Sequence, residues 1–366
     1  MAEAAGCVYL NILRLAERLS MGLVIVGYSD GSHVGQSLFR AATDMGIQAT
    51  LCGAEVAWSP IRILNALSWR LREKRPPFVA QLEKCLLQDV RRIERATVIT
   101  TGMVPVLRKT LAACRNLGAE CLHFSTDDPW NPAHKSTWHY DALEAYDIVF
   151  TSRRQNIDDL LRLSCRDVRY LPFAYDPYLL SPTDLQVTIE IDALFVGGAD
   201  ADRASFFRRY LAAGGPVKFV GAYWDRYRDM RAATLGKLSP GVIAALTRSA
   251  KVNLILVRRA NRDGHVMRSF EAAALGGCLL VEWTDEHQCI FGPEGDTVRY
   301  FRSPEDAAAI CRKLLNNSIE RARLSAAVKA RITGGRNTYR DRLDAMLQCA
   351  GKLRPGSLET EHGAPV

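Results

Sequence analysis

The sequence lacks the cysteine and histidine patterns that mark a metal-binding or disulfide-bonded protein. Its 10 cysteines include no C-x-x-C pair, and its 7 histidines complete no zinc pattern. Several cysteines lie in apolar runs, where they act as small buried hydrophobic residues. We therefore expect free thiols in a reducing compartment and no metal site.

Long apolar runs are also missing. No stretch of about 18 apolar residues occurs, which argues against a membrane-spanning helix. The first residues have no apolar core of the secretory type and carry Glu3 and Glu17. We expect a cytoplasmic protein. Residues 1–20 are expected to be an N-terminal extension, because Met21 directly precedes the first strong strand pattern.

Aromatic residues make up only 8% of the chain and are not interleaved with basic ones as in RNA-recognition modules. The net charge is +8, which favours anionic partners such as phosphorylated small molecules or acidic membrane surfaces. Nucleic acid is the weakest of these options. The remaining composition is that of a globular protein, with 48% hydrophobic and 24% charged residues.

Short apolar runs alternate with helical patterns along the chain. Residues 22–27 and 49–52 read as buried strands, and the helical pattern 36–45 lies between them. The rhythm pauses in the proline-punctuated stretch 171–188 and restarts at 192–198. Such alternation predicts an α/β protein with parallel sheets covered on both faces.

The pause divides the chain into two Rossmann-like domains in tandem. We assign residues 21–183 to the first domain, 184–336 to the second, 337–354 to a last helix and 355–366 to a flexible tail. Ligands of open α/β sheets bind at the carboxyl ends of the strands, so we expect a cleft between the domains. This fold serves many functions, and the site residues must decide among them.

A glycine-rich loop follows the first strand and contains Asp30 and His33. It leads into a helix whose N-terminus favours anions. The loop is not a G-x-G-x-x-G motif, because its glycines have a different spacing. It is not a Walker loop either, because it lacks the lysine. It is therefore either a plain turn or a cleft-lining loop in which His33 is a polar contact or base.

The stretch 124–131 places Asp127 and Asp128 before a proline, with Trp130 next to them. Adjacent carboxylates at a strand end bind a metal, hold sugar hydroxyls or act as a base. Aspartate before proline also starts ordinary turns. We favour a role in the cleft for these residues.

The first strand of the second half ends at Gly197 and Gly198, which leave room for a phosphate near the backbone. Arg203 is placed to pair with such a phosphate. Asp200 and Asp202 match the D-x-D metal pattern of single-domain sugar transferases. This match is weak, because acids also suit the first turn of a helix.

Two further segments of the second half carry candidate ligand contacts. Tyr223 and Trp224 follow another strand, where they either stack on a base or a sugar or belong to the core. The segment 258–268 is strongly basic, and Arg258, Arg262 and Arg268 could neutralise a diphosphate. A solvated basic loop is the alternative.

Glu271 is an acid inside an otherwise apolar helix, and a buried acid needs a partner. Asp263 lies eight positions earlier, on the basic loop that leads into this helix. The spacing predicts an acidic pair at the mouth of the same cleft.

Residues 60–75 form a basic amphipathic stretch. Its apolar residues either pack on the sheet, which we favour, or rest on an anionic membrane surface as a peripheral contact at the inner membrane face.

These segments together resemble the two-domain GT-B glycosyltransferases of group 1, and within them the spore-maturation-type (CgeB-like) group. The resemblance runs from about Leu23 to Leu347, and its most specific part is the R-x-F-E-A-x-x-x-G motif at 268–276. The other segments that carry it are Thr126–Pro129, Tyr146–Thr151, Tyr170–Ala174, Leu194–Gly198 and Asn337–Arg342.

The resemblance implies that the second domain binds a nucleotide-sugar donor and that the first holds the acceptor. In related retaining transferases an E-x7-E pair reaches the donor. Glu271 matches the acid that holds the ribose, and Asp263 stands where the sugar-contacting acid would be, one methylene shorter. This difference leaves retention or inversion open. The resemblance also implies a last helix that crosses back onto the first domain.

The expected activity is therefore sugar transfer from a nucleotide-diphosphate sugar, with a UDP-sugar slightly favoured and no cofactor or obligatory metal. Arg203, Arg258 and Arg268 would stabilise the charge on the departing diphosphate. Asp128 and His33 are base candidates on the acceptor side. The acceptor is a glycan, a lipid-linked molecule, a protein or a small molecule, and the oligomeric state is open. A nucleotide-sugar epimerase and a non-catalytic binding module are the alternatives. A solute-binding protein is disfavoured because no export signal is seen.

Overall fold

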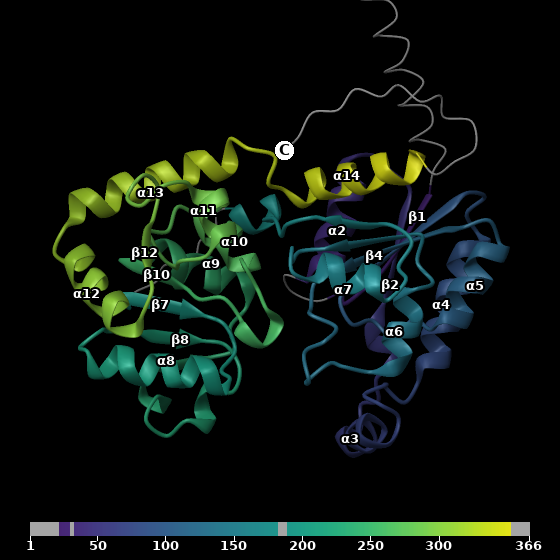
Figure 1. Ribbon diagram of the computed structural model, residues 1–366, viewed down its shortest axis with the longest axis horizontal. Coiled ribbons are helices and arrows are strands. Elements are labelled where there is room, and N and C mark those ends of the chain that lie inside the picture. The colour runs from purple at the N-terminus through teal and green to yellow at the C-terminus, as the bar shows by residue number, and fades with distance from the viewer. Residues whose placement is uncertain (1–21, 30–32, 182–188, 353–366) are drawn as a thin grey trace, which may run out of the picture.

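The structure is a computed structural model that describes residues 22–29, 33–181 and 189–352. They form two α/β domains that lie side by side, as Figure 1 shows. Each domain is built on a parallel sheet of six strands. The predicted α/β architecture with two Rossmann-like domains is confirmed.

The first sheet has the strand order β2-β1-β3-β4-β5-β6. Its strands are β1 (Gly22–Gly27), β2 (Ala49–Gly53), β3 (Ala96–Thr101), β4 (Glu120–Ser125), β5 (Ile148–Thr151) and β6 (Val168–Tyr170). Its helices are α2 (Val34–Asp44), α3 (Arg62–Leu71), α4 (Val79–Arg91), α5 (Arg108–Asn116), α6 (Thr137–Leu143) and α7 (Asn156–Arg162).

The strand β1 shows why the strands of this sheet are apolar throughout. Successive side chains of a strand point to opposite faces. Leu23 and Ile25 join the apolar cluster under α2, whereas Val24 and Val26 join the cluster under α4 and α5. All four side chains are fully buried, because helices cover both faces of the sheet.

The second sheet has the strand order β12-β11-β10-β7-β8-β9. Its strands are β7 (Ala193–Val196), β8 (Lys218–Val220), β9 (Thr234–Gly236), β10 (Val252–Ile255), β11 (Leu279–Glu282) and β12 (Arg299–Phe301). Its helices are α8 (Ala201–Ala212), α9 (Pro240–Ser249), α10 (Met267–Ala274), α11 (Asp285–Phe291), α12 (Pro304–Leu315) and α13 (Ser318–Thr333).

The chain passes between the domains twice. The first crossing follows β6, and the second leads from α13 into α14 (Tyr339–Lys352), which lies against α2 of the first domain (Figure 1). Tyr175 of the first crossing pairs with the second: its N–H donates to Asn337 O at 3.0 Å, and its carbonyl accepts from Tyr339 N at 3.1 Å. The expected return of the last helix to the first domain is confirmed.

The predicted domain boundary at 183/184 falls in residues 182–188, outside the described residues. The predicted extension 1–20 and the tail 355–366 also lie outside them.

The helix α3 differs from its predicted packing. It projects from the first domain in Figure 1, and Ile63 and Leu71 are 77% and 74% exposed. The expectation that the apolar residues of 60–75 pack on the sheet is therefore wrong. The inward face of the helix is instead made by Asn65 and Ser68, which hydrogen-bond to Ser59 and Arg75.

No helix among the described residues is long and apolar enough to span a membrane.

Candidate functional site

The carboxyl ends of β4 and β5 face the loop after β10, and charged side chains meet there between the domains. Asp263 follows β10, and Arg153 follows β5. Arg153 Nε donates to Asp263 Oδ1 at 2.6 Å, and Arg153 also donates to Thr126 O at 2.9 Å. Both side chains are almost fully buried. Burial raises the pKa of Asp263, and the Arg153 charge partly offsets this effect.

A second ion pair joins the domains beside the first. Arg262 donates to both carboxylate oxygens of Asp128, at 2.6 and 3.0 Å, and to Asp159 at 2.7 Å. Asp128 also accepts from Trp130 N at 3.0 Å, and the Arg262 guanidinium lies 5.5 Å from the centre of the Trp130 ring. The side chain of Asp128 is only 1% exposed. Its oxygens therefore already have donors in this conformation.

A third contact between the domains involves residues that the sequence did not single out. His265 Nδ1 lies 2.6 Å from Glu286 Oε2, and His265 Nε2 accepts from Phe173 N at 3.0 Å. Glu286 also accepts from Arg154 N at 3.3 Å and Tyr170 OH at 3.2 Å. Burial by itself raises the pKa of Glu286, but the hydrogen bond and charge of His265, together with the hydrogen bonds from Arg154 N and Tyr170, lower this pKa overall. Glu286 thus holds α11 against the first domain.

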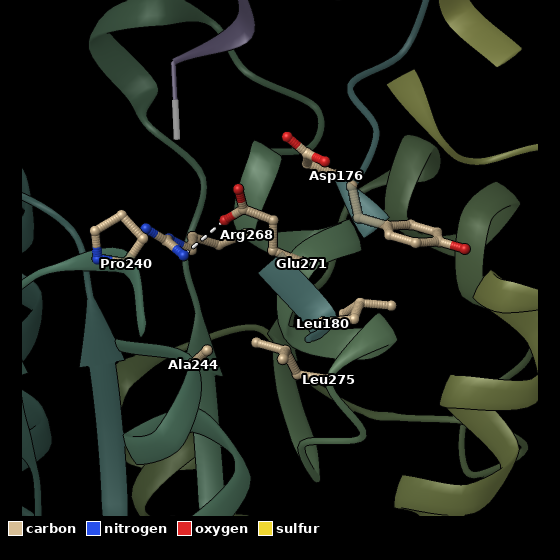
Figure 2. A pocket seen from close by; sticks show the side chains of 8 residues that line it. Asp176, Leu180, Pro240, Ala244, Arg268, Glu271 and Leu275 are labelled. Carbon is tan, nitrogen blue, oxygen red and sulfur yellow. Dashed lines mark ion pairs between the residues drawn. The ribbon is translucent and has the colours of Figure 1, made fainter. Parts of the chain in front are cut away.

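The acid Glu271 lies on α10 and lines a small pocket with the first crossing segment (Figure 2). Arg268 Nη1 lies 2.6 Å from Glu271 Oε2, although neither carboxylate oxygen accepts a well-directed hydrogen bond. Burial raises the pKa of Glu271, Arg268 lowers it, and Asp176 raises it further. Figure 2 shows the carboxyl groups of Asp176 and Glu271 on one side of the pocket and Leu180 and Leu275 on the other. A buried carboxylate without hydrogen-bond donors is suited to receive hydroxyl groups.

The pocket beside Glu271 has a volume of only about 10 Å³, which is room for one water. The crossing segment supplies Tyr175, Asp176 and Leu180 to its wall. A nucleoside therefore needs a different position of this segment or of the domains.

A separate pocket of about 130 Å³ lies at the carboxyl ends of β7, β10 and β11. Arg203 and Arg258 line it. Arg203 donates to Gly198 O at 3.0 Å, and burial lowers the pKa of its guanidinium. Asp200 caps α8 by accepting from Arg203 N at 2.9 Å and lies 3.5 Å from Arg258. The predicted donor-binding residues are thus divided between two pockets. Arg268 and Glu271 line the smaller one, and Arg203 and Arg258 line the larger one. Gly197 and Gly198 lie beside Arg203.

The aromatic residues after β8 lie in different environments. Tyr223 is 51% exposed and has a left-handed backbone, with φ 72°. Trp224 is fully buried, stacks on Phe219 at 4.1 Å and donates to Gly197 O at 2.8 Å. Of the two predicted stacking residues, Trp224 is therefore a core residue, because its ring has no free face.

The remaining acceptor-side candidates line a cavity of about 390 Å³ in the first domain. His33 and Asp127 contribute polar groups, and Met267 of α10 closes it from the second domain. Its aromatic lining consists of Tyr28, Trp58, Trp69, Trp138 and Phe173. Asp127 lies 4.0 Å from His134. Asp30, predicted for the same side, lies outside the described residues.

Some of these partners had a weak signal in the sequence. Arg153 follows a strand pattern as the first of two arginines, and His265 lies between the two predicted acids, Asp263 and Glu271. Neither pattern says which residue far along the chain it meets. Among the described residues, no group of three or more His, Cys, Asp or Glu side chains is arranged to hold a metal ion.

Comparisons with known proteins match this architecture. The model of a family described as glycosyl transferase-like matches residues 203–348, which cover most of the second domain and α14. No curated protein matches the chain.

Three solved structures align with nearly the whole fold at low identity. Sucrose-phosphate synthase of Thermosynechococcus elongatus has a TM-score of 0.61 at 14% identity, covering 91% of this chain and 98% of that one. HepE of Anabaena, in complex with UDP and glucose, has a TM-score of 0.60 at 10% identity, covering 91% and 100%. An alpha,alpha-trehalose-phosphate synthase (UDP-forming) of Burkholderia vietnamiensis has a TM-score of 0.59 at 13% identity, covering 92% and 98%. The chain therefore has the GT-B fold, and its residues 203–348 are similar to the glycosyl transferase-like family.

Proposed function

We propose that this protein is a glycosyltransferase that moves a sugar from a nucleotide-diphosphate sugar to an acceptor held by the first domain. The observation that carries the proposal is the buried carboxylate of Glu271, which forms an ion pair with Arg268 but lacks a well-directed hydrogen-bond donor on either oxygen. Two neighbouring hydroxyls of a ribose would supply two such donors. The solved structures with UDP and the glycosyl transferase-like match support the same interpretation, and UDP is the nucleotide we favour.

The chemistry that the arginines offer is charge stabilisation. Breaking the bond between sugar and phosphate develops negative charge on the diphosphate, and preorganised cations stabilise it. Arg203 and Arg258 line the pocket at the start of α8, whose N-terminus also favours an anion. In this proposal they act together with Arg268, and no divalent metal is required.

The sugar side of the proposal rests on Asp263 and the first-domain cavity. Asp263 would contact the transferred sugar, and His33 or Asp128 would serve as base if the reaction inverts. Because Arg153 and Arg262 neutralise the two acids in this conformation, the proposal requires the domains to separate before the donor binds. The motif order from Thr126 to Arg342 favours the spore-maturation-type group within these enzymes.

Calorimetric titration with UDP, GDP, dTDP and CDP tests the donor site. We expect UDP to bind, and we expect Glu271→Gln to weaken its binding about tenfold or more, since hydrogen bonds to a charged group contribute roughly 1.5–3 kcal/mol. Glu94→Gln, an exposed glutamate of the first domain, is the matched control. If no nucleotide binds, or if Glu271→Gln binds as the wild type does, the ribose assignment is wrong.

A turnover assay with the sugar form of the bound nucleotide tests the chemistry. We expect Asp263→Asn to lower kcat more than it weakens donor binding, because the acid would act on the reacting sugar. Equal losses in both would contradict this role. An altered donor sugar without transfer would indicate a nucleotide-sugar epimerase instead.

A further inference from the structure

The helix α3 is amphipathic with its apolar face turned away from the protein. Ile63, Leu64, Leu67 and Leu71 follow the spacing of one helical stripe and are between 41% and 77% exposed. Along this helix only Ser68 is buried. Surface helices normally turn the apolar stripe to the core. An outward stripe therefore indicates a partner surface.

The position of α3 is fixed by polar contacts at both ends. Ser59 and Asn65 hydrogen-bond to each other at the start, at 2.8 and 2.9 Å. After the end of the helix, Lys74 Nζ donates to Pro132 O at 2.5 Å and Lys135 O at 2.9 Å. Trp138 Nε1 donates to Glu73 O at 2.8 Å. The exposed stripe is therefore held outward by the fold.

The charge of the segment identifies the kind of partner. Residues 60–75 contain five basic residues and one acid, so their net charge is +4, half of the +8 of the whole chain. Arg62, Arg70 and Arg72 flank the stripe and are exposed. If two copies of the chain met through this face, two segments of net charge +4 would lie against each other and repel. A surface that is negatively charged and accepts apolar side chains fits both features.

We propose that α3 docks the first domain on an anionic lipid bilayer, with Ile63, Leu67 and Leu71 inserted at the level of the headgroups. The helix does not cross the bilayer; ten residues span about 15 Å and lie along its surface. Trp69, at the end of α3, also lines the 390 Å³ cavity of the first domain. Docking would thus bring the part of this cavity that Trp69 lines towards the membrane surface.

Co-sedimentation of the full chain with vesicles tests the proposal. We expect binding to vesicles of phosphatidylcholine mixed with phosphatidylglycerol, and weak binding to phosphatidylcholine alone, with added salt reducing the bound fraction. The double variant Ile63→Glu/Leu71→Glu is expected to lower the partition about tenfold or more. Both side chains are exposed, so the fold should be retained, which circular dichroism checks.

Ile319→Glu is the matched control, because Ile319 is 83% exposed on α13 of the other domain. It should bind vesicles as the wild type does. The double variant Arg62→Gln/Arg70→Gln tests the contribution of the positive charges, and it should weaken binding to anionic vesicles only. The proposal is overturned if the wild type ignores anionic vesicles, or if the Glu variants bind as strongly as the wild type. It is also overturned if the wild type forms a dimer without lipid and the Glu variants do not. The exposed stripe of α3 would then join two copies of this chain.

Discussion

At the scale of residues, the acids of the cleft take their properties from burial and from partners far along the chain. Glu271 and Asp263 were both predicted from the sequence as one pair. The structure places one against the crossing segment and the other against Arg153, 110 residues earlier in the chain. The spacing of eight residues predicted that both acids face the region between the domains. It could not predict Arg153, because that contact depends on how the two domains meet.

Burial also defines the behaviour of His287. Its Nε2 lies 2.8 Å from Ser269 Oγ and its Nδ1 lies 2.8 Å from Glu282 O, so a neutral ring satisfies both contacts. Burial lowers the pKa of His287 to about 3, from an ordinary value of 6.5. Between these values the unfolded chain binds a proton at this site and the folded chain does not. The free energy of unfolding should therefore fall as the pH falls through this window.

We expect His287→Gln to reduce the dependence of the unfolding free energy on pH by about 1 kcal/mol per pH unit. Urea unfolding of both proteins across the window measures it. Gln48→Asn, which changes an exposed side chain without a titratable group, is the control and should keep the wild-type slope. Identical slopes in the wild type and His287→Gln would contradict the neutral buried ring.

At the scale of elements, the turn before α10 depends on the absence of a side chain at Gly264. A Cβ there would lie 2.4 Å from Cδ of Glu286, which holds His265. Gly264→Ala should displace Glu286 and lower the free energy of unfolding by about 1–3 kcal/mol. Gly351→Ala on α14 is the control, since a Cβ there meets nothing within 4 Å and alanine favours a helix. Equal effects of the two variants on thermal unfolding would exclude this steric cause.

The elements themselves were largely predictable from the sequence, and their packing was less so. The predicted strand 22–27 coincides with β1, and the predicted strand 49–52 differs from β2 by one residue, because apolar strands between turn residues give a clear pattern. The pattern at 60–75 correctly indicated an amphipathic segment. Its period shows that an apolar face exists, but what covers that face depends on the neighbouring elements, and here none of the described elements covers the stripe.

At the scale of the whole molecule, buried ion pairs hold the two domains together. Arg262 adopts a left-handed backbone, with φ 51°, and bonds Asp128 and Asp159 of the first domain. Asparagine tolerates this backbone and removes the cation. Arg262→Asn should therefore leave Asp128 buried without its charge partner and favour an open arrangement.

Small-angle X-ray scattering checks this expectation as a larger radius of gyration than that of the wild type. Arg228→Asn, at an exposed arginine of the second domain, should leave the scattering unchanged. An unchanged radius of gyration in Arg262→Asn would mean that the other contacts between the domains suffice. The same opening should speed donor binding, since the pocket beside Glu271 is too small for a nucleoside in this conformation.

The hydrogen bonds between Tyr175 and the segment around Thr338 join the two crossings into one strip of backbone. Two independent linkers would let the domains twist, slide and separate freely. A joined pair behaves as a single pivot, so the relative motion reduces mainly to rotation about one axis. We therefore expect the ion pairs of Arg153 and Arg262 to form or break together when the domains rotate, because both lie on the same side of this joined strip.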